Sequence, residues 1–214
     1  MSWLATDSDR YLYPARFLDP QATIEEYVAW ALQVPMFFIA RHGQYLDCSG
    51  LPFTQFMQEG WQGHQANIGD FALHLSTLFP DARLKQHLEV RAADMSSIAY
   101  CKALSALHVG LLYDQKNLDD LHERFNAINA TQLWQARAEL DLKGLKTMLG
   151  HQSFQQWAEE LLTLAQDGLR RYEAGTECYL DPVIEQIQHG RAPADLNRRH
   201  WDGNLNTLML ACRL

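Results

Sequence analysis

The stretch LFPDARLKQHLEVRAAD, residues 78–94, constrains the fold of this chain more than any other part of its sequence. Side chains alternate between the two faces of a β-strand. A strand over residues 84–91 would therefore have one mainly apolar face and one face that is ionisable throughout. The apolar face would carry Leu84, Gln86, Leu88 and Val90, and the ionisable face Lys85, His87, Glu89 and Arg91. The stretch predicts a sheet strand whose apolar face packs against other elements.

Two interpretations of the ionisable face stay open. In the first, it is the polar side of a half-buried antiparallel strand and meets water. In the second, it binds an anionic, phosphate-bearing substrate and its metal ion, because fixed cations stabilise phosphoryl charge and carboxylates bind Mg²⁺. The sequence contains neither G-x-x-x-x-G-K-[ST] nor G-x-G-x-x-G. A nucleotide would therefore be bound by side chains and not by a glycine-rich loop.

The part of the chain before this stretch is predicted to mix helix and strand. Residues 1–20 are expected to form an irregular lead-in. Helical spacing begins at Ile24 and ends before a proline. Aromatic and β-branched runs then flank His42 and Gly43, which predicts a β-hairpin. Asp70 is expected to cap a further helix.

The part beyond residue 95 is predicted to be mainly helical, because apolar residues recur there at helical spacing. The fold class is therefore α+β, as a single domain over residues 1–214 with a sheet region at 34–94 and a helical region at 95–214. The expected helices lie near residues 98–111, 118–128, 132–140, 153–171, 181–189 and 193–199.

Charge and cysteine content exclude several classes of function. The net charge is -8 and no basic cluster is present, which argues against binding to nucleic acid or to an anionic membrane. The four cysteines form no C-x-x-C pair, so neither a zinc knuckle nor a dithiol redox motif is indicated. The N-terminus has no signal-peptide pattern, and no window of eighteen apolar residues occurs. These features predict a cytoplasmic protein.

The residues HLSTLFPDARLKQHLEVRAAD, from His74 to Asp94, resemble the signature block of the plant-type glutamate-cysteine ligase family, H-L-x-T-x-F-P-E-V-R-L-K-x-Y-L-E-x-R-G-A-D. Upstream, YVAWALQVPMFFIAR is similar to the family's Y-V-x-x-A-L-x-V-P-M-x-F-x-x-R. Downstream, VGLLYD, GLKT and LAQDGLRR match later landmarks in the same order. The resemblance covers essentially the whole chain, but only the C-terminal half of a typical member.

The resemblance implies part of a glutamine-synthetase-like antiparallel sheet, followed by helices. It implies an ATP- and Mg²⁺-dependent ligase that joins the γ-carboxylate of L-glutamate to L-cysteine and gives γ-glutamylcysteine, the first step of glutathione biosynthesis. In the family, N-terminal strands supply most of the metal-binding glutamates. The resemblance therefore implies that this chain is incomplete without an N-terminal half, which a partner chain could supply. An edge strand that pairs with its own copy would also permit a homodimer.

Site residues follow from residue type within the signature block. Arg83 and Arg91 are expected to bind phosphate or a substrate carboxylate, because a guanidinium offers a bidentate fork. Glu89 is expected to orient Arg91 or to bind the metal, and the orienting role is favoured because one carboxylate is a poor Mg²⁺ site. Lys85 is a second phosphate contact. Arg41, at the end of another predicted strand, is expected to join them.

Three further residues have two interpretations or an incomplete motif. Trp3 is either a substrate contact or simple packing. His74 lies either on a helix surface or in a pocket wall. Cys48 falls where some family members have one half of a hairpin disulfide, but its partner cysteine is missing here, so that switch is not expected.

The chain also departs from the family pattern. His87 replaces a tyrosine, and Ala92 replaces a glycine that could permit an unusual backbone conformation. Two alternatives to the ligase therefore stay open. One is a related carboxylate-amine ligase with another amine acceptor, and the other is a non-catalytic remnant that binds a small ligand or a partner protein.

Overall fold

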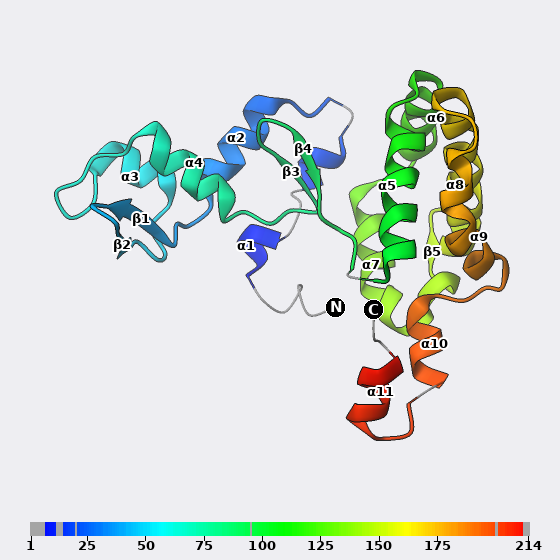
Figure 1. Cartoon of the computed structure of the whole chain (residues 1–214). Helices are drawn as coiled ribbons and strands as arrows, with labels where there is room; N and C mark the ends of the chain where they lie inside the picture. The colour runs from blue at the N-terminus through cyan, green and yellow to red at the C-terminus, as the bar shows by residue number, and fades with distance from the viewer. Residues whose placement is uncertain (1–6, 12–14, 20, 95, 200, 212–214) are drawn as a thin grey trace. The chain divides into compact units, whose positions relative to one another are not determined.

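The computed structural model describes residues 7–11, 15–19, 21–94, 96–199 and 201–211 (Figure 1). By the contacts within the chain, these residues form two compact units, unit 1 over residues 1–93 and unit 2 over residues 94–214. The expectation that the whole chain is a single domain stays a prediction.

Two helices of unit 1 begin at polar N-caps. In α2 (Ile24–Gln33), Thr23 and Glu26 form a reciprocal capping box. In α4 (Ile68–Ser76) the N-cap is Asn67, not Asp70, and Asp70 lies in the first turn, where it completes the capping box. The prediction that Asp70 is the N-cap is thus wrong, because the N-cap lies three residues earlier. The other helices are α1 (Ser8–Tyr11), the 3₁₀ helix η2 (Ala15–Leu18) and α3 (Phe53–Glu59).

The predicted first hairpin is confirmed. β1 (Phe38–Arg41) pairs with β2 (Gln44–Asp47) in antiparallel register. His42 and Gly43 both have positive φ, 52° and 76°, as a two-residue turn of this kind requires.

The predicted strand over residues 84–91 is wrong. The chain forms a hairpin there, in which β3 (Ala82–Leu84) pairs with β4 (Leu88–Val90). Residues 85–87 make the bend. The alternating pattern survives in the hairpin, but the burial is reversed, because Arg83 is buried while Leu88 and Val90 are 59% and 44% exposed. The reversal places Arg83 opposite Glu89, where the charged pair is satisfied internally.

The core of unit 1 is rich in aromatic rings. Around β1, β2 and α3 it contains Met36, Ile39, Phe53 and Phe56, each 2% exposed or less. A neighbouring cluster joins Ala31 of α2 to Leu78 beyond α4. In Figure 1 the β1–β2 hairpin and the β3–β4 hairpin lie at opposite ends of this unit, with α2 and α4 between them.

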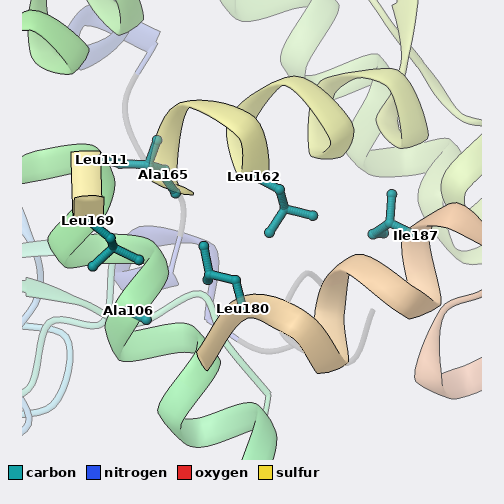
Figure 2. Close-up of a cluster of buried hydrophobic side chains, with 7 residues drawn as sticks. All are labelled: Ala106, Leu111, Leu162, Ala165, Leu169, Leu180 and Ile187. Atoms are coloured by element: carbon teal, nitrogen blue, oxygen red, sulfur yellow. The ribbon is translucent and has the colours of Figure 1, made fainter. Parts of the chain in front are cut away.

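Unit 2 is a helical bundle, as the periodicity predicts. Its core lies mainly between α5, α8 and α9, where Ala106, Leu162, Leu180 and Ile187 pack together (Figure 2). The helices of this unit are α5 (Ile98–Leu112), α6 (Gln115–Asn126), α7 (Ala130–Lys143), α8 (Phe154–Tyr172), α9 (Asp181–Gln188), α10 (Pro193–Arg199) and α11 (Leu205–Ala211), with the 3₁₀ helices η3 (Gly144–Lys146) and η4 (Thr176–Leu180).

Two glycines allow α5 and α8 to cross with their backbones in contact. A Cβ on Gly168 would lie 2.0 Å from the carbonyl oxygen of Gly110. Asn117, 1% exposed, donates from Nδ2 to the carbonyls of Gly110 and Leu164 at 2.8 and 2.7 Å. The side-chain oxygen of Asn117 accepts from Arg171 at 3.0 Å. The crossing is therefore closed by both close packing and a buried amide.

Helices and short antiparallel sheets together give the α+β class that the sequence predicts. In the described residues, each sheet has two strands, and the third pairs β5 (Met148–Leu149) with β6 (Gln152–Ser153). A search of the described helices finds none with the length and apolar character needed to span a membrane.

Candidate anion-binding site

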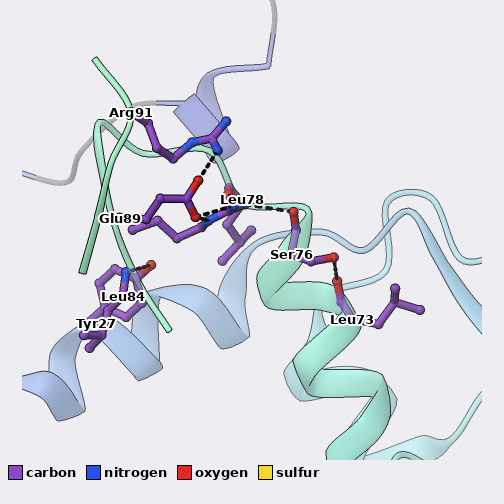
Figure 3. A network of polar contacts seen from close by, with 8 residues as sticks. Tyr27, Leu73, Ser76, Leu78, Leu84, Glu89 and Arg91 are labelled. Carbon is purple, nitrogen blue, oxygen red and sulfur yellow. Dashed lines mark hydrogen bonds and ion pairs between the residues drawn. The ribbon is translucent and has the colours of Figure 1, made fainter. Parts of the chain in front are cut away.

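Three side chains of the β3–β4 hairpin form one ionic network. Nε and Nη2 of Arg83 donate to Oε2 of Glu89 at 3.0 and 2.6 Å. Nη1 of Arg91 donates to Oε1 of the same carboxylate at 2.7 Å. Figure 3 shows the Arg91 side chain directed toward Glu89. One carboxylate therefore links two guanidinium groups, and the three side chains together keep one net positive charge.

Arg83 is the buried member of this network, with 7% of the residue exposed. Its Nη1 donates to the backbone carbonyls of Ser76 and Leu78, each at 3.0 Å. A buried charge is tolerated only when it is paired and hydrogen-bonded. Arg83 meets both conditions, so it anchors the hairpin to the end of α4.

Arg91 is the accessible member, with 30% of its side chain exposed. Within the described part of the chain, its guanidinium donates only to Glu89. Both arginines also lie near the ring of Phe79, with distances from guanidinium carbon to ring centroid of 5.2 Å for Arg91 and 5.9 Å for Arg83. Arg91 therefore keeps donors with which it can bind an added anion such as a phosphate or carboxylate.

Hydrogen bonds from Arg83 and then from Arg91 lower the pKa of Glu89. The carboxylate is therefore ionised at neutral pH, as an acceptor for two guanidinium groups must be. The arrangement supports the expected orienting role of Glu89.

The residues of this site do not fit a metal ion. Both oxygens of Glu89 already accept hydrogen bonds from arginines. The described residues contain no group of three or more His, Cys, Asp or Glu side chains that could hold a metal. Mg²⁺ requires near-octahedral oxygen ligation, which these residues do not supply.

Lys85 lies in the bend of the hairpin and is exposed. Together with Tyr27, Leu75 and Leu84 it lines a cavity of about 300 Å³ formed by α2, α4 and the bend. The Tyr27 hydroxyl accepts a hydrogen bond from the Leu84 backbone at 3.2 Å (Figure 3), and burial raises the pKa of Tyr27. Lys85 thus lies beside the arginine network in sequence but lines this largely apolar cavity.

Arg41 is not brought together with Arg83 and Arg91. Its Nη1 and Nη2 donate to the two oxygens of Asp70 at 2.6 and 2.7 Å. Hydrogen bonds from Arg41 lower the pKa of Asp70. Arg41 therefore joins the end of β1 to the first turn of α4.

His74 lies in the core and not on a helix surface, with 2% of the residue exposed. Its Nε2 lies 2.8 Å from the carbonyl of Ala31, an acceptor, so this nitrogen carries the proton. Its ring stacks on Phe53 at 5.3 Å. Burial lowers the pKa of the imidazole, which is therefore neutral at neutral pH.

The remaining positions singled out in the sequence are exposed, outside the described residues or, for Cys48, buried. Trp3 lies outside them. His87 is exposed in the bend of the hairpin. Ala92 is also exposed, and the described non-glycine residues with positive φ are His42 and Gln62. The backbone at Ala92 therefore does not need a glycine. Cys48 is buried and free, and burial raises the pKa of its thiol.

Sequence reasoning missed Arg10, Phe79 and the carbonyls of Ser76 and Leu78. Arg10 is 2% exposed although it lies in the expected irregular lead-in. No periodicity marks a four-residue helix, so the sequence offered no pattern for it. Phe79 lies inside the signature block. Its position as an aromatic residue between two predicted elements was the sequence feature that could have indicated a role at the site.

Comparison with known proteins gives one consistent result. The family model described as Glutamate-cysteine ligase family 2 matches residues 1–211. The chain is 35% identical over 196 residues to "Glutamate--cysteine ligase, chloroplastic" from Brassica juncea, and this alignment covers 90% of this chain and 38% of that protein. It is 35% identical over 204 residues to the Arabidopsis thaliana protein of the same name, covering 94% and 39%. It is 34% identical over 196 residues to the Medicago truncatula protein of that name, covering 90% and 39%. The chain thus spans about two fifths of the length of these relatives.

Proposed function

The chain belongs to the glutamate-cysteine ligase family 2, and from this premise we propose that it contributes to the ATP-dependent ligation of glutamate to cysteine. The match over residues 1–211 confirms the resemblance read from the signature block. In the proposed reaction, the γ-carboxylate of glutamate attacks the γ-phosphorus of ATP and ADP leaves. The amine of cysteine then attacks the acyl phosphate, and phosphate and a proton are released as the amide forms. The product is γ-glutamylcysteine, the first intermediate of glutathione biosynthesis.

The observation that carries this proposal is the Arg83–Glu89–Arg91 network. Phosphoryl transfer depends mostly on positioning and on electrostatic stabilisation of the transferred group. Arg91 offers an accessible guanidinium, and the carboxylate of Glu89 holds it in one orientation at 2.7 Å. Arg83 holds Glu89 in turn through two donors. Arg91 would therefore bind phosphate, while Glu89 and Arg83 would position it.

The nucleotide would enter as its Mg²⁺ complex. The carboxylates that complete the metal site would come from the part of the ligase relatives that this chain does not match. The two-stranded sheet of β3 and β4 has edge strands with which further strands can pair. We propose that it forms part of a larger sheet in a glutamine-synthetase-like fold. A partner chain would supply the remaining strands, and pairing of the exposed sheet edges of two copies of this chain would give a homodimer.

The proposed location is the cytoplasm. The relatives are named as chloroplastic proteins, and that location is a property of those relatives.

Isothermal titration of the 214-residue protein with MgATP, with and without glutamate, tests the proposal. We expect the wild type to bind MgATP, and Arg91→Ala to weaken binding at least about 10-fold, since a charge-assisted contact contributes roughly 1.5–3 kcal/mol. Arg170→Ala is the matched control, because Arg170 is an exposed arginine of unit 2 that pairs with Asp167. It should bind as the wild type does.

Equal binding by wild type and Arg91→Ala would contradict the assignment of Arg91. Absence of binding in the wild type would favour the non-catalytic alternative, unless addition of a chain bearing the remaining strands restores it. Ligation activity recovered with that chain, and lost in Arg91→Ala, would support the ligase. Activity with an amine other than cysteine would favour the related carboxylate-amine ligase.

A further inference from the structure

The N-terminal segment of residues 7–11 is fixed to unit 1 by a fully engaged arginine. Nε of Arg10 donates to Asp7 at 2.7 Å, and Nη1 donates to the hydroxyl of Thr77 at 3.1 Å. Nη2 donates to the carbonyl of Pro35. The guanidinium carbon lies 3.3 Å from the ring centroid of Phe37. A short helix held this way is far more constrained than its length suggests.

The same segment also contacts Phe79 in two ways. The backbone N–H of Phe79 donates to the carbonyl of Arg10 at 3.0 Å. The ring of Tyr11 stacks on the ring of Phe79, with centroids 5.4 Å apart and planes at 22°. Both the backbone and the ring of Phe79 are therefore held by residues 10 and 11.

Phe79 is the ring that both arginines of the candidate site approach. Its centroid lies 5.2 Å from the guanidinium carbon of Arg91 and 5.9 Å from that of Arg83. Arg83 has further anchors in the carbonyls of Ser76 and Leu78. The guanidinium of Arg91 contacts only Glu89 and the Phe79 ring in the described part of the chain. A displacement of Phe79 should therefore affect Arg91 much more than Arg83.

We propose that residues 7–11 are a positioning element of the anion site, in which Arg10 and Tyr11 hold Phe79 and Phe79 holds the Arg91 guanidinium. Tyr11 and Phe79 are positioning residues in this arrangement, since they act through Arg91. The proposal deepens the proposed function where it concerns nucleotide affinity, but the effect on Arg91 itself can be measured without nucleotide.

The test uses the full chain with ¹⁵N-labelled arginine in three forms: wild type, Tyr11→Leu and Tyr11→Phe. NMR measures proton exchange and rotation of each guanidinium group. In Tyr11→Leu we expect both rates to rise several-fold at Arg91 and to stay near wild-type values at Arg83. Affinity for MgATP should fall about 5-fold, the size of one partly exposed cation–π contact. Tyr11→Phe keeps the stacked ring and should restore both properties.

One control and one replacement variant separate positioning from general destabilisation. Tyr172→Leu removes a tyrosine of unit 2 that is 62% exposed, and should leave the Arg91 rates unchanged. If Tyr11→Leu does not fold, Phe79→Leu replaces it and should give the same difference between Arg91 and Arg83.

Unchanged Arg91 rates in a folded Tyr11→Leu variant would overturn the proposal, as would equal increases at Arg91 and Arg83. If the Arg91 rates rise but the wild type binds no nucleotide, the positioning role stands and the proposed function fails. If nucleotide binds equally well to wild type and Tyr11→Leu while the Arg91 rates rise, the segment orders Arg91 without contributing to nucleotide affinity, and its proposed role in binding is overturned.

Discussion

The two units are stabilised by different kinds of contact. In unit 1, arginines and their acceptors connect segments far apart in the sequence, as in the bond from the buried Arg10 to Thr77 and the ion pair of the partly buried Arg41 with Asp70. In unit 2, distant segments are connected mainly by apolar helix faces and by the close crossing of α5 and α8 at two glycines. Unit 1 therefore depends on specific polar partners, whereas unit 2 depends mainly on shape.

The difference bears on function. Buried, hydrogen-bonded charges cost desolvation energy, and they are a poor way to gain stability alone. They do fix side-chain geometry, which a binding site requires. The polar construction of unit 1 agrees with the placement of the candidate site there, and the apolar bundle of unit 2 is suited to rigidity.

Gly168→Ala should give the largest effect and tests the claim about shape in unit 2. The added Cβ would lie 2.0 Å from the carbonyl oxygen of Gly110 and 2.6 Å from Nδ2 of Asn117. The helices must separate, so we expect a loss of about 3 kcal/mol in the free energy of unfolding, after the gain of about 1 kcal/mol in helix propensity. Urea unfolding monitored by circular dichroism measures this loss.

Ser105→Ala is the control, because Ser105 lies on the exposed side of α5. It should change the free energy of unfolding by less than about 0.5 kcal/mol. Hydrogen exchange should show that Gly168→Ala loosens α5 and α8 and leaves α2 and α4 protected. Equal stability of Gly168→Ala and wild type would mean that the crossing is not tightly packed.

Sequence periodicity predicted unit 2 well for the same physical reason. Helices that pack through apolar faces carry that face in their sequence, so α5 to α10 were found near their observed positions. α11 was not predicted, although α10, which is equally short, was. The close approach at Gly110 and Gly168 could not be predicted, because it depends on the partner helix.

Arg83→Met should give the second largest effect and tests the polar construction of unit 1. Methionine keeps much of the volume but leaves the carbonyls of Ser76 and Leu78 without their donor, and Glu89 without one partner. Unpaired buried acceptors should lower the free energy of unfolding by about 2 kcal/mol. Hydrogen exchange should localise the loss to residues 76–91.

Lys85→Met is the matched control, since it removes an exposed cation from the same hairpin. It should leave exchange at residues 76–91 unchanged. A stability gain in Arg83→Met would show that apolar packing can replace the network, and would contradict the view that unit 1 needs its polar partners.

The site was predictable in composition but not in geometry. Arg83, Glu89 and Arg91 were selected by residue type, and the structure brings all three together. Arg41 was misplaced because pairing with Asp70 involves positions 29 residues apart, which no local pattern shows. The single strand was wrong because alternation fits one long strand and a hairpin equally well.

Asp114→Asn should give the smallest effect, because it removes one partner of an exposed ion pair. It tests whether a polar contact also contributes to the stability of unit 2. Hydrogen bonds from Arg171 lower the pKa of Asp114 to about 2, against an ordinary value of 3.8. A carboxyl whose folded pKa is depressed contributes stability above its unfolded pKa, and loses that contribution as pH falls toward the folded pKa. The contribution should thus be complete above about pH 4 and disappear toward about pH 2. Asparagine is also a good N-cap, so the variant should differ only through the charge.

Thermal unfolding at a series of pH values should show wild type more stable at pH 7 and the two proteins converging between about pH 4 and about pH 2. Asp119→Asn, on the same helix, should run parallel to wild type over that range. A constant difference between wild type and Asp114→Asn down to pH 2 would mean that the charge of the carboxylate does not contribute to stability. The contrast between a unit 1 stabilised by polar contacts and a unit 2 stabilised by apolar packing would then be stronger than the ion pair with Arg171 suggests.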